Sequence, residues 1–441
     1  MLTASRRRAI LTLSLPIIGG MASQNVFNLV DAAMVGRLGD EALAAVGFAS
    51  FLNFLFSAFV LGLSSGVQAT AARRVGQGKV AGGVAALNGG LLLSVFLAVP
   101  WSLLLVATAP FYMRLLLDAP ELVELGVPYL QLRLLSMVAM GANFAFRGYW
   151  NAVSRPGLYM RTLVVMHVAN IVLNYVFIFG AGPVPAYGVA GAGAASALAT
   201  VVGTLNYLYL GRIHTRGLNY LRSVDGWPTL MSLLRLSAPA GGQQLFFAGG
   251  MTAFVWIASR LGTQAIAATH VLTSLLLVGV LPGIGCGLAA ATLVGRSLGQ
   301  GNRAEAKRWG WEVVIFAVGV VALISLPAVI APDLVLRGFI AEADTRAMAA
   351  FPLRLVAIFM PLDTIGLVLM NAMIGAGDTR RTFITSVLLQ WGLFLPAAWV
   401  VGPVLGGGLS ALWAANVVYR QLQAVAFSLM WQRAKWADRT V

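Results

Sequence analysis

Polar side chains recur on one face of the first apolar segment, where lipid makes them costly to bury. Gln24, Asn28 and Asp31 follow the spacing i, i+4, i+7, so a helix places them on one stripe. A carboxylate inside a membrane span costs about 2.5–3.5 kcal/mol and normally faces the helix bundle or a wet cavity. Because desolvation disfavours its charged form, such a group can take up a proton on one side and release it on the other. Asp31 is therefore the leading candidate for an ion-coupling residue.

A second polar stripe, on a later apolar segment, supplies partners for that carboxylate. His167, Asn170 and Asn174 follow i, i+3, i+7 and share a helix face. Amide groups can hydrogen-bond either protonation state of a carboxylate, and their oxygens can help to coordinate a cation such as Na⁺. The alternative is a structural cluster that ties the first and fifth spans together. For His167 a capped structural position near the cytoplasmic end of its span is favoured over a role in coupling.

The elements that position these residues are membrane spans. The 441 residues are 59% hydrophobic and only 10% charged, whereas a soluble domain carries about 25% charged residues. Only helices and closed barrels satisfy backbone groups in lipid, and apolar stretches of helical spanning length recur throughout. We expect an all-α membrane protein with twelve transmembrane helices, near residues 9–34, 42–70, 84–108, 128–150, 159–180, 187–210, 232–258, 266–294, 311–330, 350–374, 383–402 and 405–430.

The net charge of +15 marks the sides of the membrane and does not indicate a nucleic-acid partner. Most basic residues lie in short connectors on one side of the spans, which is the positive-inside pattern. Both termini are therefore expected in the cytoplasm, in a bacterial-type inner (plasma) membrane. The apolar run after Arg6, Arg7 and Arg8 is too long for a signal peptide, so we interpret it as the first span. The single Cys286 excludes an intrachain disulfide.

The chain contains two copies of one module. The segment 13–78 recurs without a gap 223 residues later. The matches include Arg37-Leu38-Gly39 with Arg260-Leu261-Gly262 and Gly76-Gln77-Gly78 with Gly299-Gln300-Gly301. Because each copy holds an even number of spans, both enter the membrane in the same orientation and form a parallel repeat of two six-helix lobes. We expect an N-terminal lobe over 1–210, a cytoplasmic linker over 211–231 and a C-terminal lobe over 232–441 with a short cytoplasmic tail.

The two copies differ where the first carries polar residues. Asp31 has Phe254 as its partner in the repeat, so the second half replaces the carboxylate with an aromatic ring. Asp363 is the counter-example, because its partner is Met140. The two intramembrane carboxylates therefore lie one in each half, at places that are not equivalent, and Asp363 is a possible second acidic site.

A substrate cavity is expected where polar, aromatic and methionine side chains from both halves meet. Its predicted lining is Gln24, Gln243, Gln244, Phe247, Met251, Phe254 and Met360. Aromatic faces attract cations, and adaptable methionines tolerate varied ligands. As a set these residues suit flat, lipophilic substrates, although each alone more often faces lipid or a neighbouring helix.

Motifs of nucleotide binding and catalysis are not found in the sequence. No glycine-rich run ends in Lys-Ser or Lys-Thr, so an ATP-driven pump is not expected. Three scattered histidines and one cysteine supply no nucleophile–base or metal constellation, so we expect neither an enzyme nor a cofactor. A passive channel or scaffold gives no reason for unequal carboxylates in equal halves.

The core Val30-Asp31-x-x-Met34-x-Gly36 resembles the multidrug and toxic compound extrusion (MATE) family. Further matches to this family are Gly76-Gln77-Gly78, Asn170-x-x-x-Asn174, Gly188-Val189-x-Gly191-Ala192 and Gly375-Ala376-Gly377-Asp378-Thr379. They are spread over almost the whole chain. The resemblance implies a twelve-helix, two-lobed antiporter that expels organic cations or lipophilic drugs in exchange for H⁺ or Na⁺.

The same resemblance implies roles in the first lobe. Asp31 looks like the family's coupling carboxylate, and Asn170, Asn174 and Ser196 fall where its polar partners lie. Asn28 belongs to the stripe of Asp31 and is included in the predicted coupling site. Some family members carry Asp at the position of Asn174, so the amide here removes one charge.

In the second lobe the resemblance is partial. Asp363 matches an acidic position of Na⁺-coupled members similar to NorM, which also carry a Glu in span seven. This chain has Gln243-Gln244 there and offers no acid. The sequence therefore favours the DinF-like branch, with its coupling site in the N-terminal lobe.

A lipid-linked oligosaccharide flippase of similar architecture is the alternative function. Such a protein would need Arg or Lys inside its cavity to hold a pyrophosphate. Arg133, Arg147 and Arg354 are expected near span ends instead. We therefore expect a multidrug antiporter whose partners are the lipid bilayer and small organic molecules. The internal repeat fits a monomer.

Overall fold

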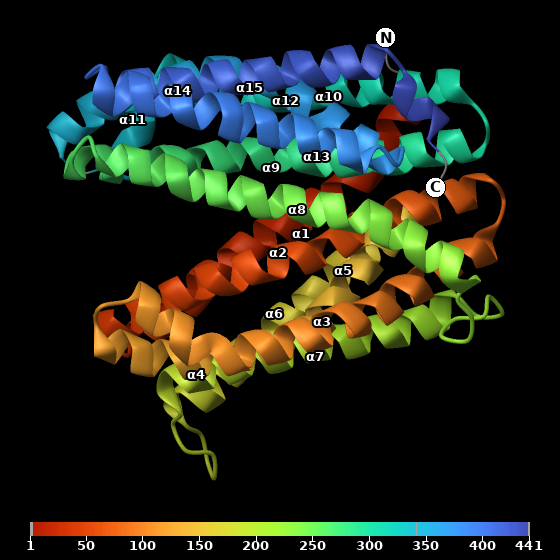
Figure 1. Ribbon diagram of the computed structural model, residues 1–441, viewed down its shortest axis with the longest axis horizontal. Helices are drawn as coiled ribbons and strands as arrows, with labels where there is room; N and C mark the ends of the chain where they lie inside the picture. The colour runs from red at the N-terminus through yellow and green to blue at the C-terminus, as the bar shows by residue number, and fades with distance from the viewer. Residues whose placement is uncertain (1–2, 341, 440–441) are drawn as a thin grey trace. The chain divides into compact units, whose positions relative to one another are not determined.

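The structure, a computed structural model, describes residues 3–340 and 342–439, and it is almost entirely helical (Figure 1). The first half contains α1 (Ala4–Gly36), α2 (Asp40–Gly76), α3 (Val80–Leu116), α4 (Pro120–Leu135), α5 (Met137–Ala152), α6 (Pro156–Phe179) and α7 (Gly188–His214). The second half contains α8 (Gly226–Ser259), α9 (Thr263–Gly299), α10 (Arg303–Ile330), α11 (Pro332–Arg337), α12 (Ala343–Gly375), α13 (Thr379–Val387), the π-helical η1 (Leu388–Phe394), α14 (Leu395–Trp399), the π-helical η2 (Val400–Val404), α15 (Gly408–Gln432) and the 3₁₀ helix η3 (Lys435–Asp438).

Within the described residues, nine helices are long and apolar enough to cross a membrane, counting Thr379–Val404 as one. The pair α4–α5, bent by 48°, makes a tenth if it is one span. α8 and α15, with 34 and 25 residues, fall outside that set but are long enough to span, and with them the expected twelve helices are accounted for. α15 is less apolar because it carries polar residues such as Arg420 and Gln421. The expected all-α membrane fold is confirmed.

The chain packs as two compact units. The N-unit is Gly19–Gly241, and the C-unit is Met1–Ile18 together with Gly242–Val441. The boundaries divide α1 after Ile18 and α8 after Gly241, positions that are one repeat of 223 residues apart. The first part of α1 therefore belongs to the C-unit, which also holds the second part of α8. The first part of α8 belongs to the N-unit, which also holds the second part of α1. The predicted lobes follow the order of the repeat along the sequence, whereas these units exchange the first parts of α1 and α8.

Charged and apolar contacts hold each exchanged segment in its unit. In the C-unit, Arg6 of α1 donates to Glu312 and, over 2.6 Å, to Glu305, both on α10. Its guanidinium lies 3.8 Å from the centre of the Trp309 ring. In the N-unit, Asp225, just before α8, accepts a hydrogen bond of 2.9 Å from Arg74 of α2.

The parallel repeat is visible in the backbone. α2 and α9 are each 37 residues long. Gly39 and Gly262 precede them with φ of 115° and 104°, and Gly78 and Gly301 follow with φ of 78° and 75°. Glycine adopts these angles without the penalty that a side chain brings. The two halves therefore enter and leave their second spans through the same turns.

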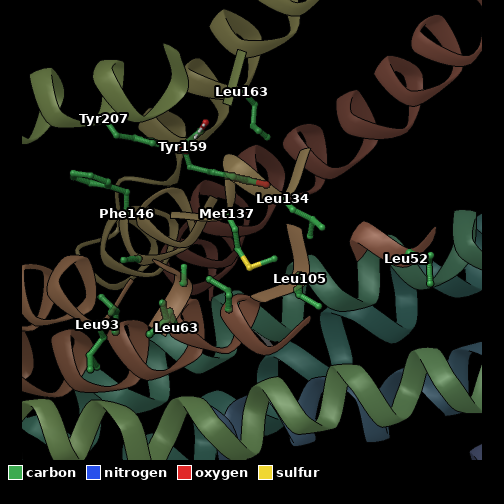
Figure 2. Close-up of a cluster of buried hydrophobic side chains, with 14 of the residues drawn as sticks. Leu52, Leu63, Leu93, Leu105, Leu134, Met137, Phe146, Tyr159, Leu163 and Tyr207 are labelled. Carbon is green, nitrogen blue, oxygen red and sulfur yellow. Dashed lines mark hydrogen bonds between the residues drawn. The ribbon is translucent and has the colours of Figure 1, made fainter. Parts of the chain in front are cut away.

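Each unit has its own apolar core. In the N-unit, Leu134 and Met137 lie on either side of the α4–α5 break and are buried in the cluster that Figure 2 shows. The Phe146 and Tyr207 rings stack there with centroids 5.2 Å apart. Large apolar side chains also lie on the outside, such as Phe111 at 72% exposed. That surface suits lipid, because a soluble protein rarely exposes large contiguous apolar patches.

Candidate functional site

A chain of side-chain hydrogen bonds links α1, α6 and α7 in the N-unit. Asn174 Nδ2 donates to Asp31 Oδ1 over 2.5 Å and to Asn170 Oδ1 over 2.6 Å. Asn170 Nδ2 in turn donates to Ser196 Oγ over 3.0 Å. The structure thus brings together four of the five residues predicted for ion coupling.

Burial makes this chain of hydrogen bonds sensitive to charge. Asn170, Asn174 and Ser196 are 2%, 0% and 4% exposed, and Asp31 is half-buried. The Oδ1 atom of Asn174 is buried and has no hydrogen-bond partner among residues 3–340 and 342–439. A buried acceptor without a partner costs about 1–3 kcal/mol. The site therefore has an acceptor ready for one more donor, and the hydroxyl of a protonated Asp31 is the nearest chemical candidate.

A second polar group lies on two of these helices, α1 and α6. Gln24 Nε2 donates to Asn28 Oδ1 over 3.1 Å, and its Oε1 lies 3.4 Å from His167 Nε2. The His167 ring stacks on Phe27 with centroids 4.6 Å apart. Asn28 is exposed and bonds to Gln24, so it lies outside the Asp31 chain.

The equivalent seam of the C-unit is aromatic. Phe254 is the repeat partner of Asp31, and in the later span, where the register is 224 residues, Phe394 and Trp391 are the partners of Asn170 and His167. Phe254 and Phe394 pack with ring centroids 5.4 Å apart. Trp391, the partner of His167, donates from Nε1 to the carbonyl oxygen of Phe246 over 3.0 Å. The contrast between a polar first half and an aromatic second half therefore extends from the sequence to the contacts.

Arg133 is a residue that sequence reasoning placed wrongly. It was expected near a span end, but α4 begins at Pro120, and the bent pair α4–α5 places Arg133 near its middle. Its Nε atom is buried without a hydrogen-bond partner, and its charge acts on the Asp31 carboxylate. An unusually early helix start and the bend after Leu135 carry this residue inward, and apolar periodicity gave no signal of either.

Asp363 has a partner that the sequence did not suggest. Arg420 of α15 donates to Asp363 of α12 over 2.6 Å, and their side chains are only 12% and 8% exposed. The guanidinium supplies the counter-charge that a bound cation would otherwise provide. The possible second acidic site is therefore a buried ion pair in this structure.

Three residues of the predicted cavity lining are packed in the C-unit. Phe254 is fully buried, and Met360, 7% exposed, packs against Gly279. Gln243 is 9% exposed and donates to Ser386 Oγ over 3.1 Å. These three side chains were expected to face a cavity, but they pack between helices of the C-unit instead.

The other predicted lining residues are accessible. Gln244 is exposed, Phe247 is 43% exposed, and Gln24 and Met251 are half-buried. Their contact with a substrate stays a prediction.

Metal ligands are sparse in the part of the chain that the structure describes. It holds no group of three or more His, Cys, Asp or Glu residues that could bind a metal ion. A Na⁺ at Asp31 would therefore take its other ligands from amide and hydroxyl oxygens such as those of Asn170, Asn174 and Ser196.

Relatives of this chain bear names that point to transport. Proteins named probable multidrug resistance protein NorM are similar over nearly its whole length. The one from Bradyrhizobium diazoefficiens is 27% identical over 440 residues, covering 96% of this chain and 93% of that protein. The one from Pseudomonas aeruginosa is 29% identical over 416 residues, covering 92% and 85%. Because these relatives carry the NorM name, the expected leaning toward the DinF-like branch is not supported.

Solved structures share the fold. A MATE structure in the bent conformation superposes with a TM-score of 0.88 at 23% identity, over 97% of this chain and 95% of that one. The outward-facing conformation of a multidrug resistance MATE family transporter gives 0.86 at 23% identity, over 98% and 96%. The MatE family model matches residues 16–176 and again residues 239–400, once in each repeat. Since these matches cover well over half of its length, the chain belongs to the MatE family.

Proposed function

We propose that this protein is a secondary antiporter that exports lipophilic or cationic drugs and toxic metabolites in exchange for H⁺, with Na⁺ as the alternative ion. One observation carries the proposal. Asp31 lies in a buried hydrogen-bond chain with Asn174, Asn170 and Ser196, whereas the equivalent seam of the other half is aromatic. The names of the relatives support export of drugs.

Asp31 is the ion-binding group in this mechanism. In its ionised form it accepts from Asn174 and holds the N-unit ready for a cationic substrate. A proton arriving from outside neutralises the carboxylate and turns it into a donor. Its amide partners on α6 and Ser196 on α7 then rearrange, and the substrate loses its counter-charge. Alternating access places substrate binding on the inner side of the membrane, and proton binding with substrate release on the outer side.

The membrane potential drives this exchange when the substrate is neutral. One ion exchanged for one singly charged cation is electroneutral, and the concentration gradient of the ion drives that exchange instead. One elementary charge that crosses 100 mV releases about 2.3 kcal/mol. Since about 1.4 kcal/mol corresponds to a factor of ten, one ion exchanged for a neutral drug supports more than tenfold accumulation. No nucleotide or cofactor is needed for such a cycle.

The membrane setting completes the proposal. The protein is a multi-pass membrane protein, and its basic connectors support a bacterial inner membrane with both termini in the cytoplasm. The lobes 1–210 and 232–441, joined by the linker 211–231, are the proposed moving parts. The internal repeat supplies both lobes from one chain, so we propose a monomer.

The test is export of a fluorescent cationic dye from proteoliposomes, with ΔpH and ΔNa⁺ imposed separately. We expect ΔpH to drive export by the wild type and Asp31→Asn to abolish it. Asp40→Asn, an exposed carboxylate outside the polar chain, is the matched control and should behave as wild type. Export by folded Asp31→Asn at the wild-type rate would refute the mechanism. Export driven only by ΔNa⁺ would assign the coupling to sodium.

A lipid-linked oligosaccharide flippase is the second candidate, and one observation favours it. Arg133 lies inside the bent pair α4–α5, and Arg147 of α5 is half-buried and donates to Ser64 Oγ over 3.0 Å. Guanidinium groups bind phosphate well. Movement of a fluorescent pyrophosphate lipid without any movement of dye would favour this function over drug antiport.

A further inference from the structure

Arg133 is half-buried within the N-unit, and among the described residues no carboxylate forms a direct ion pair with its guanidinium. Its Nε atom is buried and makes no hydrogen bond. Its neighbours in sequence fix its place, because Leu130 and Leu134 are fully buried in the apolar core, and Figure 2 shows Leu134 in that core. An ionisable residue within a transmembrane segment indicates a functional site and should have a nameable partner.

Contacts between helices place Arg133 beside the polar chain. One turn before it, the backbone of Tyr129 packs so closely on α7 that a side chain at Gly193 would meet it. Two turns or more after it, Asn143 Nδ2 donates to the carbonyl oxygen of Thr200 on α7 over 3.1 Å. The stretch of α7 between these contacts contains Ser196, the end of the hydrogen-bond chain from Asp31.

The charges of Arg133 and Asp31 interact without forming a direct ion pair. The positive charge of Arg133 acts on the Asp31 carboxylate and on the Tyr129 hydroxyl. The buried pair of Arg420 and Asp363 in the C-unit differs, because these two side chains are in direct contact at 2.6 Å. In that pair the two charges satisfy each other. In the N-unit they stand apart, and each is left able to bind a further charged group.

A single ligand with both charges matches this arrangement. An ammonium group would take Asp31, and a carboxylate would take the fork of N–H donors of Arg133, which suits planar oxyanions. Protonation of Asp31 would remove the partner of the ammonium group and leave Arg133 unchanged. The ligand would then lose one of its two anchors, as export in exchange for a proton requires.

We propose that the N-unit is a site for zwitterionic amphiphiles, with Asp31 as the pole for the ammonium group and Arg133 as the pole for a carboxylate or similar oxyanion. Arg133 is then the residue that distinguishes zwitterions from simple cations. This inference rests on the proposed antiport function and adds the substrate class to it.

The test compares 2-naphthylalanine with its methyl ester, which keeps the ammonium and the ring but lacks the carboxylate. Each compound competes with ΔpH-driven export of a fluorescent cationic dye from proteoliposomes. Wild type should prefer the amino acid over the ester about 10- to 100-fold, which corresponds to about 1.4–2.8 kcal/mol. Arg133→Gln should reduce this preference to about onefold. Arg133→Lys should keep part of it, because a point charge replaces the fork.

The controls separate charge recognition from folding and from coupling. Arg114→Gln, which removes an exposed arginine of α3 in the same unit, should keep the wild-type preference. A preference unchanged in folded Arg133→Gln, or a wild type that prefers the ester, overturns the inference. If wild type moves no dye under any gradient, the proposed antiport fails. Equilibrium binding of the two compounds in detergent, followed by naphthyl fluorescence for the same variants, then decides the role of Arg133 by itself.

Discussion

Asn174 donates from one amide nitrogen to both Asp31 and Asn170, over 2.5 and 2.6 Å, while its own buried oxygen has no partner. Protonation of Asp31 creates a hydroxyl that needs an acceptor. Rotation of the Asn174 amide would offer the free oxygen to that hydroxyl and withdraw the donor from Asn170. Because Asn170 is bonded to Ser196, a change of protonation on α1 would be transmitted through α6 to α7.

The first prediction concerns Asn174 itself. Asn174→Ala removes both bonds and leaves the acceptors of Asp31 and Asn170 without their donor. We expect the free energy of unfolding to fall by about 1–3 kcal/mol and ΔpH-driven export to be lost. Thermal unfolding in detergent and dye export from proteoliposomes measure the two effects.

Thr200→Val is the matched control for Asn174→Ala. Thr200 Oγ1 bonds only to the carbonyl oxygen of Ser196 in its own helix, over 2.8 Å, so its loss should leave export nearly unchanged. If Asn174→Ala unfolds and transports like Thr200→Val, the Asn174 amide has no special role.

The second prediction concerns the buried pair of Asp363 and Arg420. Asp363→Asn alone leaves a buried guanidinium without its counter-charge and should destabilise the protein by about 3–5 kcal/mol. The double variant Asp363→Leu with Arg420→Met replaces the pair by apolar groups, and stability should recover. Chemical denaturation in detergent measures both.

The double variant also separates structure from coupling. If the pair is structural, ΔpH-driven export should persist in the double variant. Loss of export at normal stability would instead show that Asp363 takes part in ion coupling.

Much of this arrangement follows from sequence, and the exceptions have physical causes. The polar stripes that contain Asp31 and Asn174 were predictable, because helical spacing and the differences between the two repeats can be identified from the sequence alone. The positions of Arg133 and Arg420 were not, because that of Arg133 depends on a helix bend and the partner of Arg420 depends on packing between distant helices. The exchange of the first parts of α1 and α8 was also hidden, since each helix is continuous in sequence.

The third prediction tests the close helix crossing inside the N-unit. Gly62 of α2 faces the backbone of α8, where an added methyl group would clash with the carbonyl oxygen of Ser237. Gly62→Ala should therefore destabilise the protein by about 1–3 kcal/mol through overpacking. Gly47→Ala, on the same helix with open space around it, should be neutral or stabilise by up to about 1 kcal/mol. Equal unfolding temperatures for the two variants would contradict the observed crossing.

The last prediction concerns pH and the loop between α12 and α13. Asp378 is 2% exposed, accepts from Arg439 Nε over 3.1 Å and lies 3.6 Å from Arg381. Burial raises the pKa of Asp378 above its ordinary value of 3.8, although the two arginines oppose the shift. Because the folded state then holds the proton more firmly than the unfolded state, this group stabilises the protein below pH 3.8 and the contribution is lost as pH rises through the folded pKa.

Thermal unfolding of wild type and Asp378→Asn across pH 4–7 measures this loss. The unfolding temperature of wild type minus that of Asp378→Asn should fall as pH rises, since only wild type has the titrating carboxyl. Asp438→Asn removes an exposed carboxylate that is next in sequence to Arg439 and pairs with Arg303, and it should give a difference that barely changes with pH. If the unfolding temperature of wild type minus that of Asp378→Asn instead grows with pH, Arg381 and Arg439 lower the pKa of Asp378 more than burial raises it. The ionised carboxylate would then hold Arg439 of the C-terminal segment.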